Sequence, residues 1–197
     1  RGRDYLETLI EAYPQAPERG DAWFGLANLD VMQDDFSGAN RWLTTFREEV
    51  PLHPKRHEAT LLQARIQIQQ GAAEQAIELL NSVLREKAAR GRPHAEAVFL
   101  LGNAYREQAE LRKAIASYQR VFTLYRAFGD LVAAAYLEAA RAFERLGRRE
   151  DALRHLDELL GMDDLKYQIA YLDAVELRAS WSGSDAPLTG SDVIKAP

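Results

Sequence analysis

The sequence predicts an all-α fold, a solenoid of stacked helical hairpins. Four segments of the chain can be laid over one another, which indicates an internal repeat. Within each segment, apolar residues recur at spacings of three and four, the pattern of an amphipathic helix. Each segment is interpreted as helix, short turn, helix. The segments are residues 21–46, 58–83, 95–121 and 133–159.

An alanine at the start of each second helix sets the register of the repeat. Successive alanines are 37, 38 and 38 residues apart. Such regular spacing, together with matching flanking residues, indicates that one structural unit recurs along the chain. The four alanines are Ala39, Ala76, Ala114 and Ala152.

Small residues are expected where the two helices of a hairpin approach closely. The first helices carry Ala27, Ala64, Gly102 and Ala140 at equivalent positions. Large apolar residues follow each second-helix alanine four and seven places later, so small residues can pack against large ones. The turns contain Gly71 and Gly147, where a positive φ is readily adopted.

Among the four segments, the third shows the clearest resemblance to a known family of repeats. Its run Leu101-Gly102-Asn103-Ala104-Tyr105, followed by Ala114, Tyr118 and Val121, resembles the tetratricopeptide consensus W-x2-L-G-x2-Y and then A-x3-F. Trp23, Leu26 and Ala27 match the same opening in the first segment, and the resemblance covers about residues 2–160. It implies a right-handed superhelical solenoid whose first helices line a concave groove that binds a protein or peptide.

The repeat is longer than the usual tetratricopeptide period of about 34 residues. Longer repeats with linkers such as Tyr13-Pro14-Gln15-Ala16-Pro17 are similar to bacterial envelope proteins of the cell-division coordinator and outer-membrane-assembly lipoprotein type. That resemblance implies a bacterial protein and favours a periplasmic or envelope location over the cytoplasm.

The register predicts a solenoid over residues 1–180 and a flexible tail over 181–197, which is rich in Gly, Ser, Pro and Asp. Leu165, Ile169, Leu172 and Val175 are expected to share the buried face of a final capping helix. The predicted parts are a half repeat at 1–16, repeats at about 20–53, 57–90, 95–128 and 133–164, and the capping helix at 165–180.

The resemblance also implies which residues face the groove. The ninth positions form a polar row, Asn28, Arg65, Asn103 and Arg141, and the fifth positions an apolar row, Phe24, Leu61, Phe99 and Leu137; Arg106 lies at a twelfth position. Asparagine can bond a peptide backbone and arginine can bind a carboxylate, so the expected partner is a protein or peptide with acidic and apolar residues. Alternatively, the fifth-position residues pack between neighbouring first helices.

Composition and motifs argue against other functions. The net charge of −5 disfavours nucleic acid, and no apolar run is long enough to span a membrane. Without cysteine or any nucleophile, phosphate or zinc motif, we expect no enzyme, cofactor or metal site. His53 and His57 flank Pro54 and are expected to be solvated linker residues, while Asp34-Asp35 and Asp163-Asp164 are expected to cap helices.

Two other functions remain open at this point. The chain could self-associate as an assembly scaffold through its N-terminal helix, around Tyr5, Leu6 and Leu9. It could equally be a sensor module of a larger regulator or enzyme.

Overall fold

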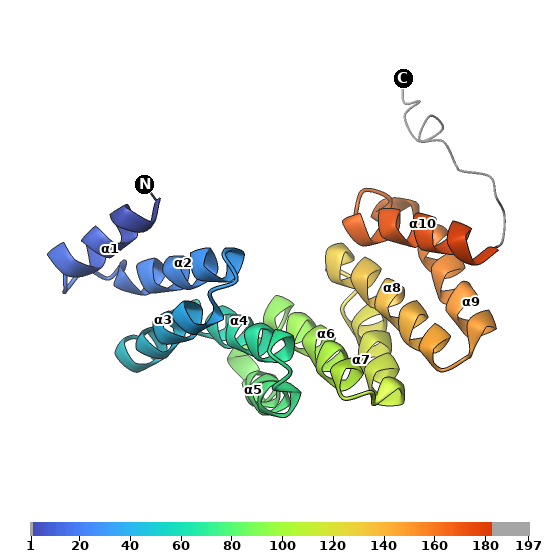
Figure 1. Ribbon diagram of the computed structural model, residues 1–197, viewed down its shortest axis with the longest axis horizontal. Helices are drawn as coiled ribbons and strands as arrows, with labels where there is room; N and C mark the ends of the chain where they lie inside the picture. The colour runs from blue at the N-terminus through green and yellow to red at the C-terminus, as the bar shows by residue number, and fades with distance from the viewer. Residues whose placement is uncertain (1, 183–197) are drawn as a thin grey trace, which may run out of the picture. The chain divides into compact units, whose positions relative to one another are not determined.

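The computed structural model describes residues 2–182, and all regular structure in that range is helical (Figure 1). The predicted all-α class is confirmed. The helices are α1 (Gly2–Ala12), α2 (Arg19–Met32), α3 (Phe36–Glu49), α4 (Arg56–Gln69), α5 (Ala73–Arg85), α6 (Arg92–Glu107), α7 (Leu111–Leu124), α8 (Gly129–Arg145), α9 (Arg149–Leu160) and α10 (Ile169–Ser182), with 3₁₀ turns η1 (Lys87–Ala89) and η2 (Asp163–Leu165).

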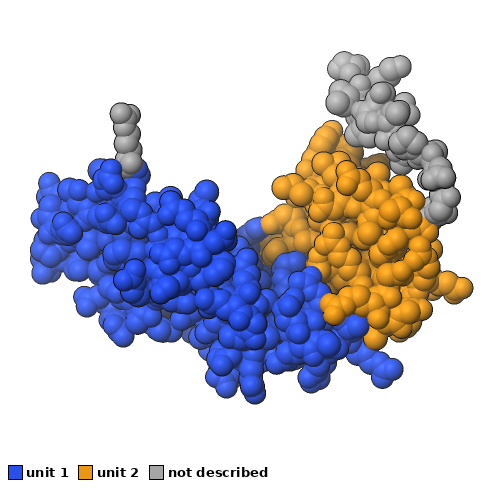
Figure 2. Space-filling view, viewed as in Figure 1, with its two compact units in different colours: residues 1–117 blue, residues 118–197 orange. Residues whose placement is uncertain are grey.

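The chain divides into two compact units, residues 1–117 and residues 118–197, with the boundary inside α7 (Figure 2). In the first unit α1 packs on α2, α2 on α3, α4 on α5, and α6 on both α4 and α5. In the second unit α8 packs on α9, and α10 lies against both. Helical hairpins that contact mainly their neighbours in sequence form a solenoid, as predicted.

The four hairpin turns share one backbone conformation. In each turn one residue has a positive φ of 57° to 76°, and the next N–H donates to the carbonyl five residues earlier. This is the Schellman ending of a helix. The positive-φ residues recur at the spacing of the repeat: Asp34, Gly71, Ala109 and Gly147.

The prediction at Gly71 and Gly147 is confirmed, whereas Asp34 and Ala109 adopt the same conformation without being glycine. Asp tolerates this region better than most residues, but the methyl group of alanine is crowded there. The repeat therefore imposes its turn geometry even where the local residue disfavours it.

The small and large residues pack as predicted. The four alanines that set the register are completely buried, and so the paired helices approach closely at these points. The large residues four and seven places later are also buried, and Trp23 joins them in the core of the first unit. These large residues are Leu43, Phe46, Leu80, Val83, Tyr118, Val121, Leu156 and Leu159.

The final helix differs from the prediction in its start and in its buried face. Leu165 lies in η2 with its side chain in the core of the second unit, so α10 begins only at Ile169. Ile169 and Leu172, predicted to be buried, are 79% and 50% exposed. Because Leu165 is outside the helix, spacing counted from it does not define a helix face. The residues that pack on the core are Ala170, Tyr171, Ala174, Leu177 and Trp181.

The predicted tail lies outside the described residues except for Trp181 and Ser182, which end α10. Trp181 is held to the second unit by Arg149. The Arg149 guanidinium lies 5.6 Å from the centre of the indole ring, and its Nη2 donates to the Trp181 carbonyl at 2.8 Å.

Candidate protein-binding groove

The predicted groove residues lie on first helices: α2, α4 and α6 in the first unit and α8 in the second. On each helix the fifth and ninth positions are four residues apart, which places the two side chains on one helix face. The pairs are Phe24 with Asn28, Leu61 with Arg65, Phe99 with Asn103, and Leu137 with Arg141.

Arg65 connects two first helices of the first unit. Its Nη2 donates to Oε1 of Glu96 at 2.6 Å, from α4 to α6, and its side chain stays half exposed. An exposed ion pair of this kind contributes only about 0–1 kcal/mol. The pairing of Arg65 with Glu96 can therefore be broken at little cost in stability.

The two asparagines are half-buried and have interactions within the chain. Nδ2 of Asn28 donates to the carbonyl oxygen of Phe24 at 2.8 Å, one helical turn earlier, and Asn103 also interacts within the chain. A side-chain amide has two donor hydrogens and an acceptor oxygen. One bond to its own helix therefore leaves Asn28 able to bond a peptide backbone.

The apolar row is divided between core and surface. Leu61 and Leu137 are only 1% and 3% exposed, so these side chains pack inside the protein. Phe24 and Phe99 are half-buried, and the Lys55 ammonium lies 5.7 Å from the centre of the Phe24 ring. Apolar contact with a partner is thus available at the two phenylalanines and not at the two leucines.

The other two arginines pair with acids close by in sequence. In the second unit, Nη1 of Arg141 donates to Oε1 of Glu138 at 2.6 Å, within α8. On α6, Nη2 of Arg106 donates to Oε1 of Glu107 at 3.2 Å. The charges of both arginines are therefore partly neutralised within the chain.

The histidines are less exposed than predicted. His57 is buried, and His53 packs its ring edge-on against Phe46 with centroids 5.1 Å apart. The expectation of solvated linker histidines is wrong, because the linker folds back over α2 and α3: a Cβ on Gly20 would overlap the His53 ring. His155 is also buried, and its Nδ1 lies 2.8 Å from the Asp151 carbonyl oxygen.

Asp35 has the capping role predicted for it. Its Oδ1 accepts a hydrogen bond from the Gly38 N–H at 2.9 Å, at the N-terminus of α3. Sequence reasoning missed the neighbouring Asp30, which is buried and forms an ion pair with Arg3 that ties α1 to α2. The available signal was its position: Asp30 lies seven residues after Trp23, on the buried stripe of α2.

Two kinds of feature are absent from the part of the chain that the structure describes: a membrane-spanning helix and a cluster of metal ligands. None of its helices combines the length and apolar character of a membrane span. No group of three or more histidine, cysteine or acidic side chains there is placed to hold a metal ion.

A family model of the tetratricopeptide repeat matches residues 31–93 and 99–166, more than half of the chain. The chain belongs to the tetratricopeptide repeat family. Tetratricopeptide repeats form scaffolds for protein interaction, which is the general role that family membership supports. No curated protein matches this tetratricopeptide protein at a significant level.

Among solved structures, this tetratricopeptide protein is similar to two crystal structures of MamA, each with 21% sequence identity and a TM-score of 0.56. The first match covers 80% of this chain and 85% of the solved chain, and the second covers 84% and 87%. At this level of identity the likeness concerns the fold alone.

Proposed function

We propose that this tetratricopeptide protein binds a protein or peptide through the face of its first helices that carries Asn28, Arg65, Asn103 and Arg141. The observation that supports this most directly is the composition of that face on α4 and α6. A half-exposed guanidinium, Arg65, lies on one helix, and a half-buried aromatic ring, Phe99, lies on the other.

The partner that suits this face is a segment with acidic and apolar side chains. A carboxylate can take the place of Glu96 on Arg65, and an apolar side chain can cover Phe24 or Phe99. Leu61 and Leu137 contribute indirectly, because they fix the helices that carry the polar row.

The test compares two fourfold variants of the chain. The groove variant carries Asn28→Ala, Arg65→Ala, Asn103→Ala and Arg141→Ala. The control variant carries Arg41→Ala, Gln75→Ala, Arg112→Ala and Gln119→Ala, exposed residues of second helices with the same total change in charge. Proteins captured from native lysate by the unchanged chain are identified, and the affinity of each purified candidate for all three chains is measured.

The proposal expects a partner whose affinity falls about tenfold or more with the groove variant and stays unchanged with the control. Circular dichroism must show that both variants are folded. Equal affinity for the two variants would contradict the proposal, because the contact would then lie on another surface.

A second candidate function is self-association, which exposed apolar residues favour. On α1, Tyr5 is largely exposed, and on α10 Ile169 is as well. Light scattering over a range of concentrations separates the two functions. A mass that rises with concentration supports self-assembly, and a constant monomer mass together with capture of another protein supports the groove.

A further inference from the structure

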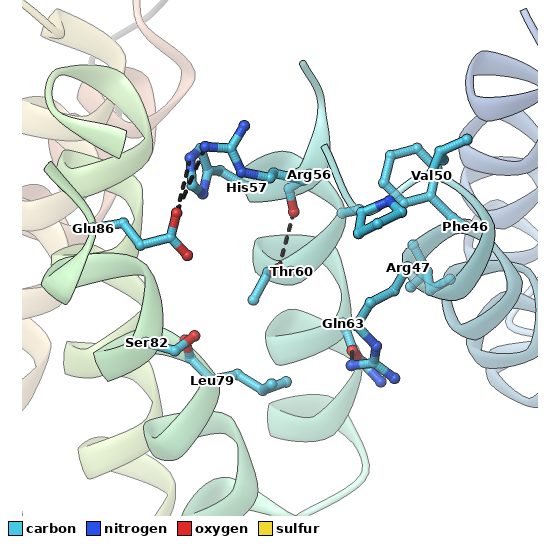
Figure 3. A pocket seen from close by; sticks show the side chains of 13 residues that line it. Phe46, Arg47, Val50, Arg56, His57, Thr60, Gln63, Leu79, Ser82 and Glu86 are labelled. Atoms are coloured by element: carbon cyan, nitrogen blue, oxygen red, sulfur yellow. Dashed lines mark hydrogen bonds and ion pairs between the residues drawn. The ribbon is translucent and has the colours of Figure 1, made fainter. Parts of the chain in front are cut away.

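A cavity of about 350 Å³ lies between α3, α4 and α5 of the first unit (Figure 3). Its apolar part includes Leu43, Phe46 and Ala59. Thr60 of α4 and Leu79 of α5 extend into it from opposite sides, as Figure 3 shows. A space of this size is sufficient for one large side chain of a partner.

The cavity lies on a different face of α4 from the proposed groove. Thr60 and Gln63 line the cavity, whereas Leu61 and Arg65 belong to the groove rows. Successive residues of an α-helix are about 100° apart, so Gln63 and Arg65 point to nearly opposite sides of the helix. Nothing about this cavity therefore depends on the function proposed for the groove.

The repeat register identifies the equivalent place in the second unit. Arg47 lies eight residues after Ala39, the second-helix alanine of its repeat. Phe122 lies eight residues after Ala114, the corresponding alanine two repeats later. Thr60 lies four residues before Ala64, the small residue of its first helix. Tyr136 likewise lies four residues before Ala140, the small residue of α8. By the same count, Leu79 corresponds to His155.

Aromatic rings occupy that equivalent place. Phe122 and Tyr136 are stacked with centroids 4.0 Å apart and an interplanar angle of 13°, and the His155 ring lies 6.0 Å from Phe122. In the first unit the corresponding side chains are an exposed arginine and a threonine, which leave the space open. The chain itself thus shows that this position between repeats accommodates aromatic rings.

A buried histidine lies beside the cavity. His57 is only 6% exposed, and its Nε2 has no hydrogen-bond partner within the described residues. The nearest carboxylate oxygen, Oε2 of Glu86, is 3.6 Å away and equally far from Nη2 of Arg56. Because this nitrogen is also inaccessible to solvent, it does not select the occupant; Tyr136, which has the repeat position of Thr60 in the second unit, assigns a tyrosine to the cavity.

Arg47 supplies the charge complementarity. Its Nη1 donates to the neutral amide oxygen of Gln63 at 3.1 Å, and no acid among residues 2–182 pairs with it. Arg56, in contrast, already has Glu86. An acidic residue next to the tyrosine would find its counter-ion in Arg47.

We propose that this cavity binds a tyrosine side chain of a protein partner, with a neighbouring acidic residue of the partner paired to Arg47. The phenol ring lies between Thr60 and Leu79, where Phe122 and Tyr136 lie in the second unit. The groove and the cavity are then two separate contact sites on one scaffold.

The test is a titration of the ¹⁵N-labelled chain with acetyl-Gly-Glu-Tyr-Gly-amide, followed by NMR. Backbone amide signals of Thr60, Gln63 and Ser82 are expected to shift and to saturate at millimolar concentration. Replacing the peptide tyrosine by alanine is expected to weaken binding about tenfold or more, and replacing its glutamate by glutamine about threefold.

Variants of the chain complete the test. Arg47→Phe with Thr60→Tyr copies the aromatic pair of the second unit and should abolish saturation while leaving the chain folded. Arg47→Gln should weaken binding about threefold. Arg41→Gln, the same change in charge on the same helix but outside the cavity, should leave binding unchanged.

The proposal is overturned if the alanine peptide binds as well as the tyrosine peptide, or if Arg41→Gln weakens binding as much as Arg47→Gln. It is also overturned if no signal saturates by about 10 mM peptide. The groove variant described above retains the cavity, so it should bind this peptide normally even if the groove proposal fails.

Discussion

The same place between successive repeats is open in the first unit and filled in the second. Arg47, Thr60 and Leu79 surround a cavity between α3, α4 and α5. Phe122, Tyr136 and His155 have the equivalent positions in the second unit, and their rings are packed together. Two places with the same register can therefore serve as a hydrophobic core or as a cavity, depending only on the side chains.

The histidines at the two places also differ in whether a ring nitrogen has a hydrogen-bond partner. Nδ1 of His155 lies 2.8 Å from the Asp151 carbonyl oxygen, so the histidine of the filled place has a partner. Nε2 of His57 beside the cavity has no hydrogen-bond partner within the described residues, and its ion-pair partner, Oε2 of Glu86, is 3.6 Å away. A buried polar atom without a hydrogen-bond partner lowers the stability of the folded state. We expect the filled place to contribute stability, and the open place is the one that we propose as a binding site.

The largest expected effect tests this contrast directly. Tyr136→Ala removes a buried ring from a packed stack and is expected to lower the free energy of unfolding by about 3 kcal/mol. Thr60→Ala, at the equivalent position beside an existing cavity, is expected to cost less than about 1 kcal/mol. Urea unfolding followed by circular dichroism measures both. Equal costs would show that the two places do not differ in packing.

A smaller effect is expected in the hairpin turns, where two repeats have glycine and two do not. Ala109→Gly should raise the free energy of unfolding by about 0.5 kcal/mol, because glycine adopts the positive φ of this turn without crowding. Gly71→Ala should lower it by about 1 kcal/mol for the same reason. Thermal unfolding of the two single variants checks the opposite signs, and a change in the same direction would contradict the shared turn geometry.

The smallest expected effect is a dependence of stability on pH, which arises from Tyr136 in the filled place. Burial raises the pKa of the Tyr136 phenol above its ordinary value, and the nearby carboxylate of Glu158 adds to the shift, while Arg126 opposes it. The folded state then holds the phenol proton more tightly than the unfolded state. The resulting stabilisation is complete below the unfolded pKa of about 10 and is lost as pH rises above it.

The measurement is the thermal midpoint between about pH 9 and pH 11, compared with Tyr136→Phe, which keeps the ring and loses the titrating group. The unchanged chain should lose stability more steeply than the variant over this range. Identical slopes would mean that the Tyr136 pKa is not raised in the folded protein.

Much of the fold could be predicted because it depends on spacing. The alanines that set the register and the large residues after them are buried as expected, since close helix packing demands small beside large. The buried face of α10 could not be predicted by the same count. Its phase depends on η2, where Leu165 leaves the helical pattern and enters the core of the second unit.

The exposure of the candidate groove residues could not be predicted from the sequence. Phe24 and Phe99 lie partly at the surface, whereas Leu61 and Leu137 do not, although all four share one position in the repeat. Burial at that position depends on how helices of the adjacent repeats pack, and the sequence of a single repeat does not determine this packing. The cavity beside Arg47 required the three-dimensional positions of α3, α4 and α5 together.

The sequence by itself determined the all-α class, the repeat register and the close-packed helix pairs, because these follow from local periodicity and from small residues at regular spacing. Only the tertiary structure decided which polar groups meet across helices. Arg65 reaches Glu96 and Arg3 reaches Asp30 over about thirty residues of chain. It also decided where side chains leave space, since a cavity is the volume left between several helices.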